Sequence, residues 1–395
     1  MHRRAFLTAA AGCGAAVARG AAPDAAGPLG RCGPLPIETV RVVGGDAPCE
    51  VRLSSGAIAR YAFGIVRIRA AGFEGVGEGH VKDAAALAQV ARGLVGADAR
   101  RLDHLLPERT PAPIGEAVSI ALHDLVARAL GVPFHVLLGA AARTRVPVVP
   151  CLFANAPAAA AARAAQFARL GFPGVKFKLF GDAEQDLAVL EAVRGSTPPG
   201  RTVQADANCG YRDLETVRRL LPRLAAAGLD VLEDPLESTP ADPYRDYAAL
   251  RGATRIRIML DIGVRPEGGL AEAIRRRSGD LVNLHPNQQG SVSRTLRRAA
   301  AAETMGLPVF MGGTGSFGIQ AAAWQQLAAV IASDLPCGEI GGAFDHGFPE
   351  DVVVAPYRLD EGAVSLPDAP GLAIALDDDA VGRMARFDET FDTPA

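Results

Sequence analysis

Charged residues end several short apolar runs of this sequence, and three of them are acids that suit a metal site. These acids are Asp206, Glu233 and Asp261. If the runs are neighbouring parallel strands, the three carboxylates meet at one edge and repel one another unless a cation lies between them. Each acid alone could be a helix cap or a strand-end ion pair. Together, in matching register, they predict an oxygen-ligated ion, with Mg²⁺ the first choice and Mn²⁺ the second.

A further run ends in Lys176-Phe177-Lys178 and places two amino groups beside these acids. Residues two apart on a strand face the same side, so both lysines point one way while Phe177 packs on the other. Two ammonium groups in one partly dry pocket are expected to lower each other's pKa, as a lysine base requires. A lysine base with a divalent ion suits removal of the proton α to a carboxylate, because the ion stabilises the enediolate that forms.

The elements that would position these residues are parallel strands wrapped by helices, because short apolar runs alternate with amphipathic stretches after about residue 145. The runs lie at 146–151, 174–178, 202–206, 230–233, 256–261, 281–285, 308–311 and 336–340. The first is the weakest, since Pro147 and Pro150 cannot donate to a strand ladder. Eight such units favour a closed barrel, and no GxGxxG turn opens the first unit. Active sites of such barrels lie at the carboxyl ends of the strands, which is where the charged residues stand.

The chain before the barrel is strand-like from about 36 to 78 and predicts an antiparallel meander, with strands near 39–43 and 64–69. Helical spacing follows from Val118 to Ala129 and stops at Gly131. The tail from about Val352 has strand and turn signals and is expected to pack back on this region. The predicted organisation is therefore a leader and linker (1–34), an α+β domain (35–145), a barrel (146–351) and a C-terminal segment (352–395).

The composition favours a small-molecule partner. A net charge of −3 and an isoelectric point near 6.2 argue against a surface for nucleic acid, which usually requires a clear basic excess. The six cysteines have no zinc-ligand spacing, and a disulfide between Cys32 and Cys49 stays open without support from the sequence. No stretch approaches the roughly 20 apolar residues of a membrane span.

The first residues resemble a bacterial twin-arginine export signal. Arg3 and Arg4 precede Ala5-Phe6-Leu7 and a weakly apolar, alanine-rich stretch. Cleavage at a small-residue site between about 18 and 22 would leave a linker to about Pro34 and a mature chain outside the cytoplasm. Cys13 lies in a weak lipid-attachment pattern, and a chance arginine pair in an irregular N-terminus, with the protein cytoplasmic, is the alternative.

Several motifs together give the chain a resemblance to the enolase superfamily, in its mandelate racemase and muconate lactonizing branch, which includes muconate cycloisomerases and dipeptide epimerases. The likeness runs from about Pro36 to Leu376. Its markers are Gly72-Phe73-Glu74-Gly75-Val76-Gly77-Glu78, Lys176-Phe177-Lys178, Asp206-Ala207-Asn208, Glu233-Asp234-Pro235, Gly338-Glu339-Ile340-Gly341-Gly342 and Pro370-Gly371-Leu372. A lysine or histidine base paired with Mg²⁺ is the known pattern of these sites.

The resemblance implies a modified TIM barrel, (β/α)₇β, under an α+β capping domain. It implies Mg²⁺ on Asp206, Glu233 and Asp261, with Lys178 as the base and Lys176 assisting electrostatically. Asn208 would contact the substrate or support a ligand. Loops of the capping domain, around 52–61, would close over the substrate, and the protein would be a homo-oligomer.

Three departures from the family pattern bear on the reaction. Ile262 follows Asp261 where the family usually has Glu. His285 ends the sixth run where the cycloisomerase and epimerase groups carry a lysine, and the loop at Thr314 lacks the accompanying glutamate. If His285 is a second acid or base, racemisation or epimerisation remains open. If it only contacts substrate or caps the next helix, one base remains, which suits cycloisomerisation or the loss of water from a hydroxy or sugar acid.

Two further hypotheses stay open at this point. Lys178 could form a Schiff base in a barrel aldolase, which needs no metal. Alternatively, the chain could be a homologue that binds a carboxylate without turning it over. The leading prediction is an isomerase that forms a metal-stabilised enediolate from a carboxylate substrate.

Overall fold

The computed structural model describes residues 33–54, 56–237, 242–313, 315–333, 347–354 and 358–393. Every element given below lies within Pro34–Ala395. The predicted export signal, the eighth predicted strand at 336–340, the Gly338–Gly342 motif and Thr314 lie outside the described residues. Within the described residues, no helix is long and apolar enough to cross a membrane.

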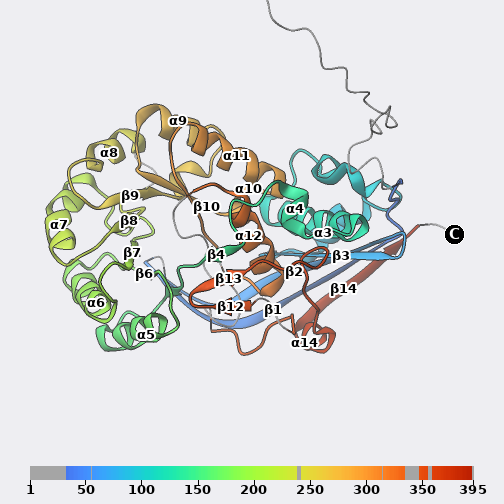
Figure 1. Cartoon of the computed structure of the whole chain (residues 1–395), viewed down its shortest axis with the longest axis horizontal. Coiled ribbons are helices and arrows are strands. Elements are labelled where there is room, and N and C mark those ends of the chain that lie inside the picture. Colours follow the sequence, from blue (N-terminus) through green and yellow to red (C-terminus); the bar gives the residue numbers. More distant parts are fainter. Residues whose placement is uncertain are drawn as a thin grey trace, which may run out of the picture. The chain divides into compact units, whose positions relative to one another are not determined.

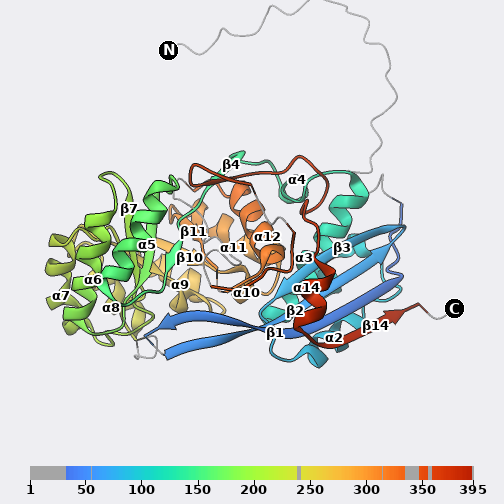
Figure 2. The same cartoon turned by 90° about the horizontal axis from the view of Figure 1, so that it is seen from below.

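An antiparallel sheet in the order β14-β1-β2-β3 forms the cap (Figures 1 and 2). Its strands are β1 (Thr39–Leu53), β2 (Gly56–Ala70), β3 (Phe73–Gly79) and, from the C-terminal segment, β14 (Ala385–Asp392). The first two strands are longer than the sequence predicts. Beyond Gly44 and before Gly64 the two strands continue as one hairpin, in which Ala47, Cys49 and Val51 of β1 are buried; Figure 2 shows it running on toward the barrel strands.

Helix α3 (Ala112–Leu130) packs directly against β3, and this contact explains the glycines of the predicted motif. A Cβ atom at Gly75 would overlap the carbonyl oxygen of Ala121, and one at Gly77 would overlap that of Ala117. Glycine is therefore required on this face of the strand. The helix ends at Gly131 in the left-handed conformation, as predicted. The remaining elements of the cap and tail are α2 (Ala84–Arg92), η1 (Ala99–Leu105), α4 (Phe134–Leu138), β12 (Arg358–Asp360), β13 (Ala363–Ser365) and α14 (Asp378–Met384).

Seven parallel strands in the order β11-β10-β9-β8-β7-β6-β5 curl into the barrel wall (Figure 1), which confirms the predicted fold class. They are β5 (Cys151–Leu152), β6 (Gly174–Lys178), β7 (Thr202–Asp206), β8 (Val231–Glu233), β9 (Arg257–Leu260), β10 (Leu281–Leu284) and β11 (Val309–Met311). The prediction of one strand at 146–151 is wrong. β4 (Arg145–Pro147) pairs with β13 instead, because the prolines at 147 and 150 interrupt the ladder and only Cys151 and Leu152 enter the barrel.

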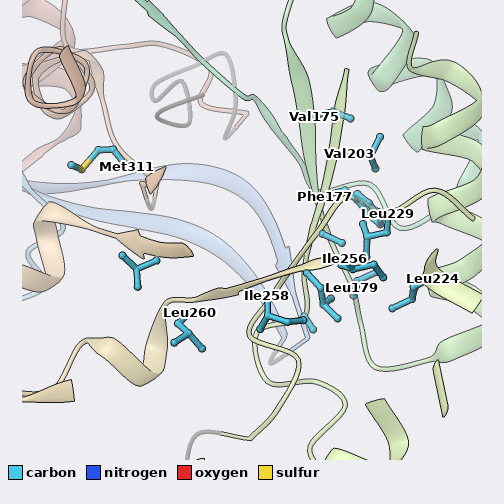
Figure 3. Packing of buried hydrophobic residues seen from close by; sticks show 14 of the residues in the cluster. Val175, Phe177, Leu179, Val203, Leu224, Leu229, Ile256, Ile258, Leu260 and Met311 are labelled. Carbon is cyan, nitrogen blue, oxygen red and sulfur yellow. The ribbon is translucent and has the colours of Figure 1, made fainter. Parts of the chain in front are cut away.

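Helices cover the outside of this wall, and the strand residues alternate between the two faces. The helical segments are α5 (Pro157–Arg169), α6 (Ala183–Ser196), α7 (Leu214–Ala226), α8 (Pro243–Leu250), η2 (Ile262–Val264), α9 (Gly269–Arg276), α10 (Pro286–Gln289), α11 (Val292–Thr304) and α12 (Gly318–Val330). Figure 3 shows part of the apolar layer between strands and helices, with Phe177 and Ile258 among its members. A separate buried cluster inside the barrel comprises Val149, Val231, Met259, Leu281 and Phe310.

Candidate active site

Five successive strands carry polar side chains above the apolar cluster inside the barrel. Alternation along β8 and β10 decides this placement, because Val231 and Leu281 belong to the interior cluster and residues two positions later face the same way. Lys178 is in register with Asp206, and Asp206 with Glu233. The strand order then places Asp261 and His285 next in the row. The polar group at the mouth comprises Lys176, Lys178, Asp206, Glu233, Asp261 and His285, all buried.

The two lysines neutralise the first two acids of this row. Lys178 Nζ lies 2.6 Å from Asp206 Oδ2. Lys176 Nζ lies 2.9 Å from Glu233 Oε2 and 3.7 Å from Asp206 Oδ2. Burial opposes the charge on Asp206, but Lys178 and then Lys176 outweigh it and hold the pKa of that carboxyl below its usual range. Asp206 is therefore a carboxylate that already has two cationic partners.

Glu233 occupies the centre of the row, and its ionised form is less well stabilised than that of Asp206. Its Oε1 atom accepts a 2.8 Å hydrogen bond from the side-chain amide of Asn283. Burial, followed by the negative charge of Asp206, raises its pKa although Lys176 opposes this. The excess negative charge around Glu233 favours an additional cation at this position.

Asp261 has a partner that the sequence analysis missed, Arg265. The guanidinium Nε lies 3.0 Å from Oδ1 and Nη2 lies 2.5 Å from Oδ2, so the pair is bidentate. Burial opposes the charge on Asp261, but His285 and Arg265 together lower the pKa of the carboxyl below its usual range. Nothing in the sequence distinguishes Arg265, because arginines are abundant in this chain. It follows Asp261 by four positions, and only the η2 turn between them brings the two side chains together.

Asp234 positions Asp261 by binding the backbone amides at the end of the next strand. Its carboxyl oxygens accept hydrogen bonds from the amides of Asp261, at 3.1 Å, and Ile262, at 2.7 Å. Burial and the nearby charge of Asp261, followed by that of Glu233, raise the pKa of Asp234 well above its ordinary value. The two acids at the end of β8 therefore have different roles. Glu233 faces the mouth, and Asp234 holds the backbone at the end of β9.

His285 lies directly after β10 and faces Asp261. Its Nε2 atom is 3.3 Å from Asp261 Oδ2, yet neither ring nitrogen makes a hydrogen bond to a described residue. One donor atom each from Glu233, Asp261 and His285 lies within 4.8 Å of the others, which is close enough to share a metal ion. The three predicted acids lie in one row, but the described atoms closest to an ion-binding arrangement are two of those acids with the histidine.

The predicted contact residue Asn208 connects this row to the cap. Its backbone and side-chain amides donate to Asp206, at 2.8 and 3.1 Å, from a left-handed backbone conformation. Its carbonyl oxygen accepts a 3.1 Å hydrogen bond from Ser54 Oγ at the tip of the β1–β2 hairpin. The hairpin thus reaches the barrel mouth, within the capping region that the sequence predicts to cover the substrate.

A cavity of about 950 Å³ lies on the β5 side of the barrel, and none of the six residues of the row lines it. Its walls are the β1–β2 hairpin, with Cys49 and Ile58, and the segment after β5, with Arg163 from α5. Cys151 belongs to this wall and pairs with Lys176 on the neighbouring strand, so the wall of the cavity lies one strand away from the two lysines. Its volume suits a small organic substrate.

Lysine itself is a signal that the sequence analysis did not use. Of the 41 cationic residues, only Lys82, Lys176 and Lys178 are lysines, and two of the three are buried at the mouth. Arginine cannot lose its proton near neutral pH, whereas lysine can. Two buried lysines in an arginine-rich chain therefore indicate a site where an amine that can lose its proton is required.

Comparisons with known proteins agree with this architecture. Residues 37–139 match the family described as mandelate racemase / muconate lactonizing enzyme, N-terminal domain. Residues 159–380 match the family described as enolase C-terminal domain-like. The two matches together cover the cap and the barrel.

Individual relatives give the same result. A chloromuconate cycloisomerase of Cupriavidus pinatubonensis is 30% identical over 275 residues, covering 68% of this chain and 71% of the relative. An L-Lys-D/L-Arg epimerase of Methylococcus capsulatus is 31% identical, covering 72% and 80%. The crystal structure of an N-succinyl Arg/Lys racemase from Bacillus cereus superposes with a TM-score of 0.81 at 21% identity, covering 90% and 99%, which is a likeness of fold.

Proposed function

The chain belongs to the mandelate racemase/muconate lactonizing enzyme branch of the enolase superfamily, and we propose that it is an isomerase that removes the proton α to a substrate carboxylate. The observation that carries this proposal is the convergence of two buried lysines and three buried carboxylates on one barrel mouth. Its relatives include a cycloisomerase and an epimerase, so isomerisation through a shared enediolate is the reaction class.

Lys178 is the base in this proposal. It retains 8% exposure at the mouth, whereas Lys176 is fully buried between Asp206 and Glu233. Only Lys178 can therefore reach a proton on a substrate in the mouth, while Lys176 holds a fixed positive charge beside the developing enediolate. Asn208 keeps Asp206 in position beside Lys178 through its two amide hydrogen bonds.

The acids Asp206, Glu233 and Asp261 would hold a divalent ion, Mg²⁺ or Mn²⁺. The unpaired ring nitrogens of His285 and the raised pKa of Glu233 both fit a cation in this row. When bound, such an ion stabilises the two oxygens of an enediolate. The hydrogen bond from Ser54 to Asn208 brings the hairpin over the mouth and reduces access of water to the reacting carbon.

The experiment that tests this function is a screen of carboxylates in D₂O with Mg²⁺ or Mn²⁺, read as α-deuteration by NMR. At least one of the acid sugars, acylated amino acids, dipeptides or unsaturated diacids should exchange its α-hydrogen, and EDTA should stop the exchange. A pure binding protein would bind a ligand without exchange. An aldolase would keep its activity in EDTA and be trapped covalently by borohydride, and either outcome would overturn the proposal.

We also propose that the protein is exported by the twin-arginine route. The basis is the Arg3-Arg4 pair ahead of a weakly apolar stretch. Replacement of both arginines by lysine should leave the precursor in the cytoplasm, while the unchanged chain is found outside it with an N-terminus near Ala21. Normal export of the double-lysine variant would remove this proposal.

A further inference from the structure

We propose that His285 is a ligand of the ion at the barrel mouth and that it shifts the preference of the site from Mg²⁺ to Mn²⁺. The inference rests on the proposed function, which requires a divalent ion, and adds a nitrogen donor to the expected carboxylates. Its basis is the Glu233–Asp261–His285 group, in which one donor atom from each residue lies within 4.8 Å of the others.

The unsatisfied state of the His285 ring is the first argument. The side chain is buried, with 4% of the residue exposed, and neither Nδ1 nor Nε2 makes a hydrogen bond to a described residue, although Nε2 lies 3.3 Å from Asp261 Oδ2. A buried polar group without a partner destabilises the fold, so such groups usually have a ligand or an ordered water. An ion between Glu233 and Asp261 would be that partner.

The direction of the ring is the second argument. His285 and Asn283 are two residues apart at the end of β10, and the amide of Asn283 donates to Glu233 Oε1 at 2.8 Å. The same face of the chain therefore directs the ring toward Glu233 and Asp261. His285 also precedes α10, but its side chain makes no capping hydrogen bond to that helix. A structural role as a helix cap therefore does not account for it.

The charges of the neighbouring groups are the third argument. Asp206 is held by both lysines, with Lys178 at 2.6 Å, so its negative charge is largely compensated. Glu233 and Asp261 are the two acids grouped with the ring, and among the described lysines and arginines each has a single close partner, Lys176 or Arg265. Each carboxylate oxygen has two lone pairs, so the contacts to Lys176 and Arg265 leave room for a metal bond.

The nitrogen donor decides which ion fits best. Mg²⁺ prefers an octahedral shell of oxygens and retains several waters, whereas imidazole suits the first-row transition ions. Mn²⁺ accepts both carboxylate oxygen and imidazole nitrogen. A ring nitrogen bound to the ion cannot take a proton from substrate, so Lys178 is left as the base, which favours a one-base isomerisation over inversion at the α-carbon.

The test measures ion binding to the full-length protein after chelation, without reference to activity. Mn²⁺ is titrated by the loss of the free-ion signal in electron paramagnetic resonance, and Mg²⁺ by its displacement of bound Mn²⁺. Wild-type protein should bind Mn²⁺ at least about tenfold more tightly than Mg²⁺. In His285→Ala, Mn²⁺ affinity should fall by about 10- to 100-fold while Mg²⁺ affinity changes less, so that the ratio collapses.

Two variants keep the result interpretable. His285→Asn supplies an amide oxygen in place of the nitrogen and should move the preference back toward Mg²⁺. His104→Ala removes an exposed histidine on η1 and should leave both affinities unchanged. Thermal unfolding without metal verifies that each variant is folded.

The outcomes separate this inference from the function on which it rests. If wild-type protein binds both ions and Glu233→Gln abolishes binding, but His285→Ala leaves the Mn²⁺ to Mg²⁺ ratio unchanged, His285 is no ligand and the function stands. If wild-type protein binds neither ion, both proposals fail.

Discussion

Buried carboxyl groups occur in two regions of this protein, and their partners differ. At the barrel mouth, Asp206, Glu233 and Asp261 face lysine, arginine and histidine side chains. At the junction of cap and barrel, a second group, here called the junction cluster, joins β3 and α3 to α12. It consists of Tyr61, Glu78, Glu116, Gln320 and Trp324.

The junction cluster binds its carboxyls with neutral donors. Glu78 accepts hydrogen bonds from the Tyr61 hydroxyl, at 2.9 Å, and from the amides of Phe317 and Gln320, at 2.7 and 3.0 Å. Glu116 accepts from Trp324 Nε1 at 2.7 Å and from the Gln320 side chain at 2.5 Å. No described lysine or arginine forms an ion pair with either. The four carboxyl oxygens all have donors, so this cluster holds α12 in place and offers nothing to a ligand.

The comparison shows that partners, and not burial, separate a reactive carboxyl from a structural one. Burial raises the pKa of Glu78 to about 7 and that of Glu116 well above its ordinary value. Asp206 is equally buried, but the lysines lower its pKa. The carboxyls at the mouth have charged lysine, arginine and histidine partners, whereas those of the junction cluster have neutral hydrogen-bond donors.

The largest expected effect concerns the base. Lys178→Ala should lower α-hydrogen exchange by at least about 10²- to 10⁴-fold, because general-base losses are of that size. Lys178→Arg should be as inactive, since it keeps the charge but cannot accept the proton. Exposed Lys82→Ala is the matched control. Activity in Lys178→Arg would show that this position needs only a positive charge.

The next effect separates the two regions by ion binding. Glu233→Gln removes an anionic ligand and should weaken binding of Mn²⁺ or Mg²⁺ on the order of 10²-fold, as should Asp206→Asn and Asp261→Asn. Glu116→Gln changes an equally buried carboxyl of the junction cluster and should leave ion affinity unaltered while changing thermal stability. Calorimetric titration reads the affinities. Equal losses in Glu233→Gln and Glu116→Gln would erase the distinction between the regions.

The two regions should also respond to pH in opposite directions. A carboxyl whose pKa rises on folding binds its proton more tightly in the folded protein, so Glu78 should lower the free energy of unfolding as pH rises from about 4.5 to about 7, by up to about 3 kcal/mol. The lowered pKa of Asp206 gives stability that is present above its unfolded pKa and lost as pH falls through its folded pKa.

Urea unfolding of metal-free protein between pH 4.5 and 8 measures this difference. Glu78→Gln should flatten the decline in stability toward neutral pH, and exposed Glu361→Gln should not. An unchanged slope in Glu78→Gln would mean that the carboxyl of Glu78 is ionised throughout this range.

The smallest effect concerns Arg265, which competes with the ion for Asp261. Removing a partly exposed ion pair is worth up to about 1 kcal/mol, so Arg265→Gln should tighten ion binding by up to about fivefold. Arg294→Gln breaks a more exposed pair with Glu267, away from the ion, and serves as the control. Weaker ion binding in Arg265→Gln would show that the guanidinium supports the ligand instead of competing for it.

The row at the mouth could be predicted from sequence because a strand imposes its own geometry. Period-two alternation places Lys176 and Lys178 on one face, and the parallel order brings Asp206, Glu233 and Asp261 to the same end. The strand bounds found for β6 and β7 are those predicted at 174–178 and 202–206. The role of Asp234 escaped notice, since nothing in Glu-Asp-Pro says that the second acid holds the backbone of the next strand.

Contacts between distant segments could not be predicted in this way. Glu116 and Trp324 are 208 positions apart and meet only when α3 and α12 pack. Arg265 reaches Asp261 through the short η2 turn, and no hydrophobic periodicity in the sequence predicts that turn. The alternation of Gly75 and Gly77 was visible as a motif, but its cause, the close approach of the α3 backbone, appears only in the structure.

The central claim is that the barrel mouth, and not the junction cluster, binds the divalent ion on which the chemistry depends. Its most direct test is to locate Mn²⁺ by anomalous scattering in crystals of the protein grown with the ion in excess. The account predicts one ordered peak at the mouth, coordinated by oxygens of Asp206, Glu233 and Asp261. An empty mouth under these conditions, or a peak between Glu78 and Glu116, would contradict it.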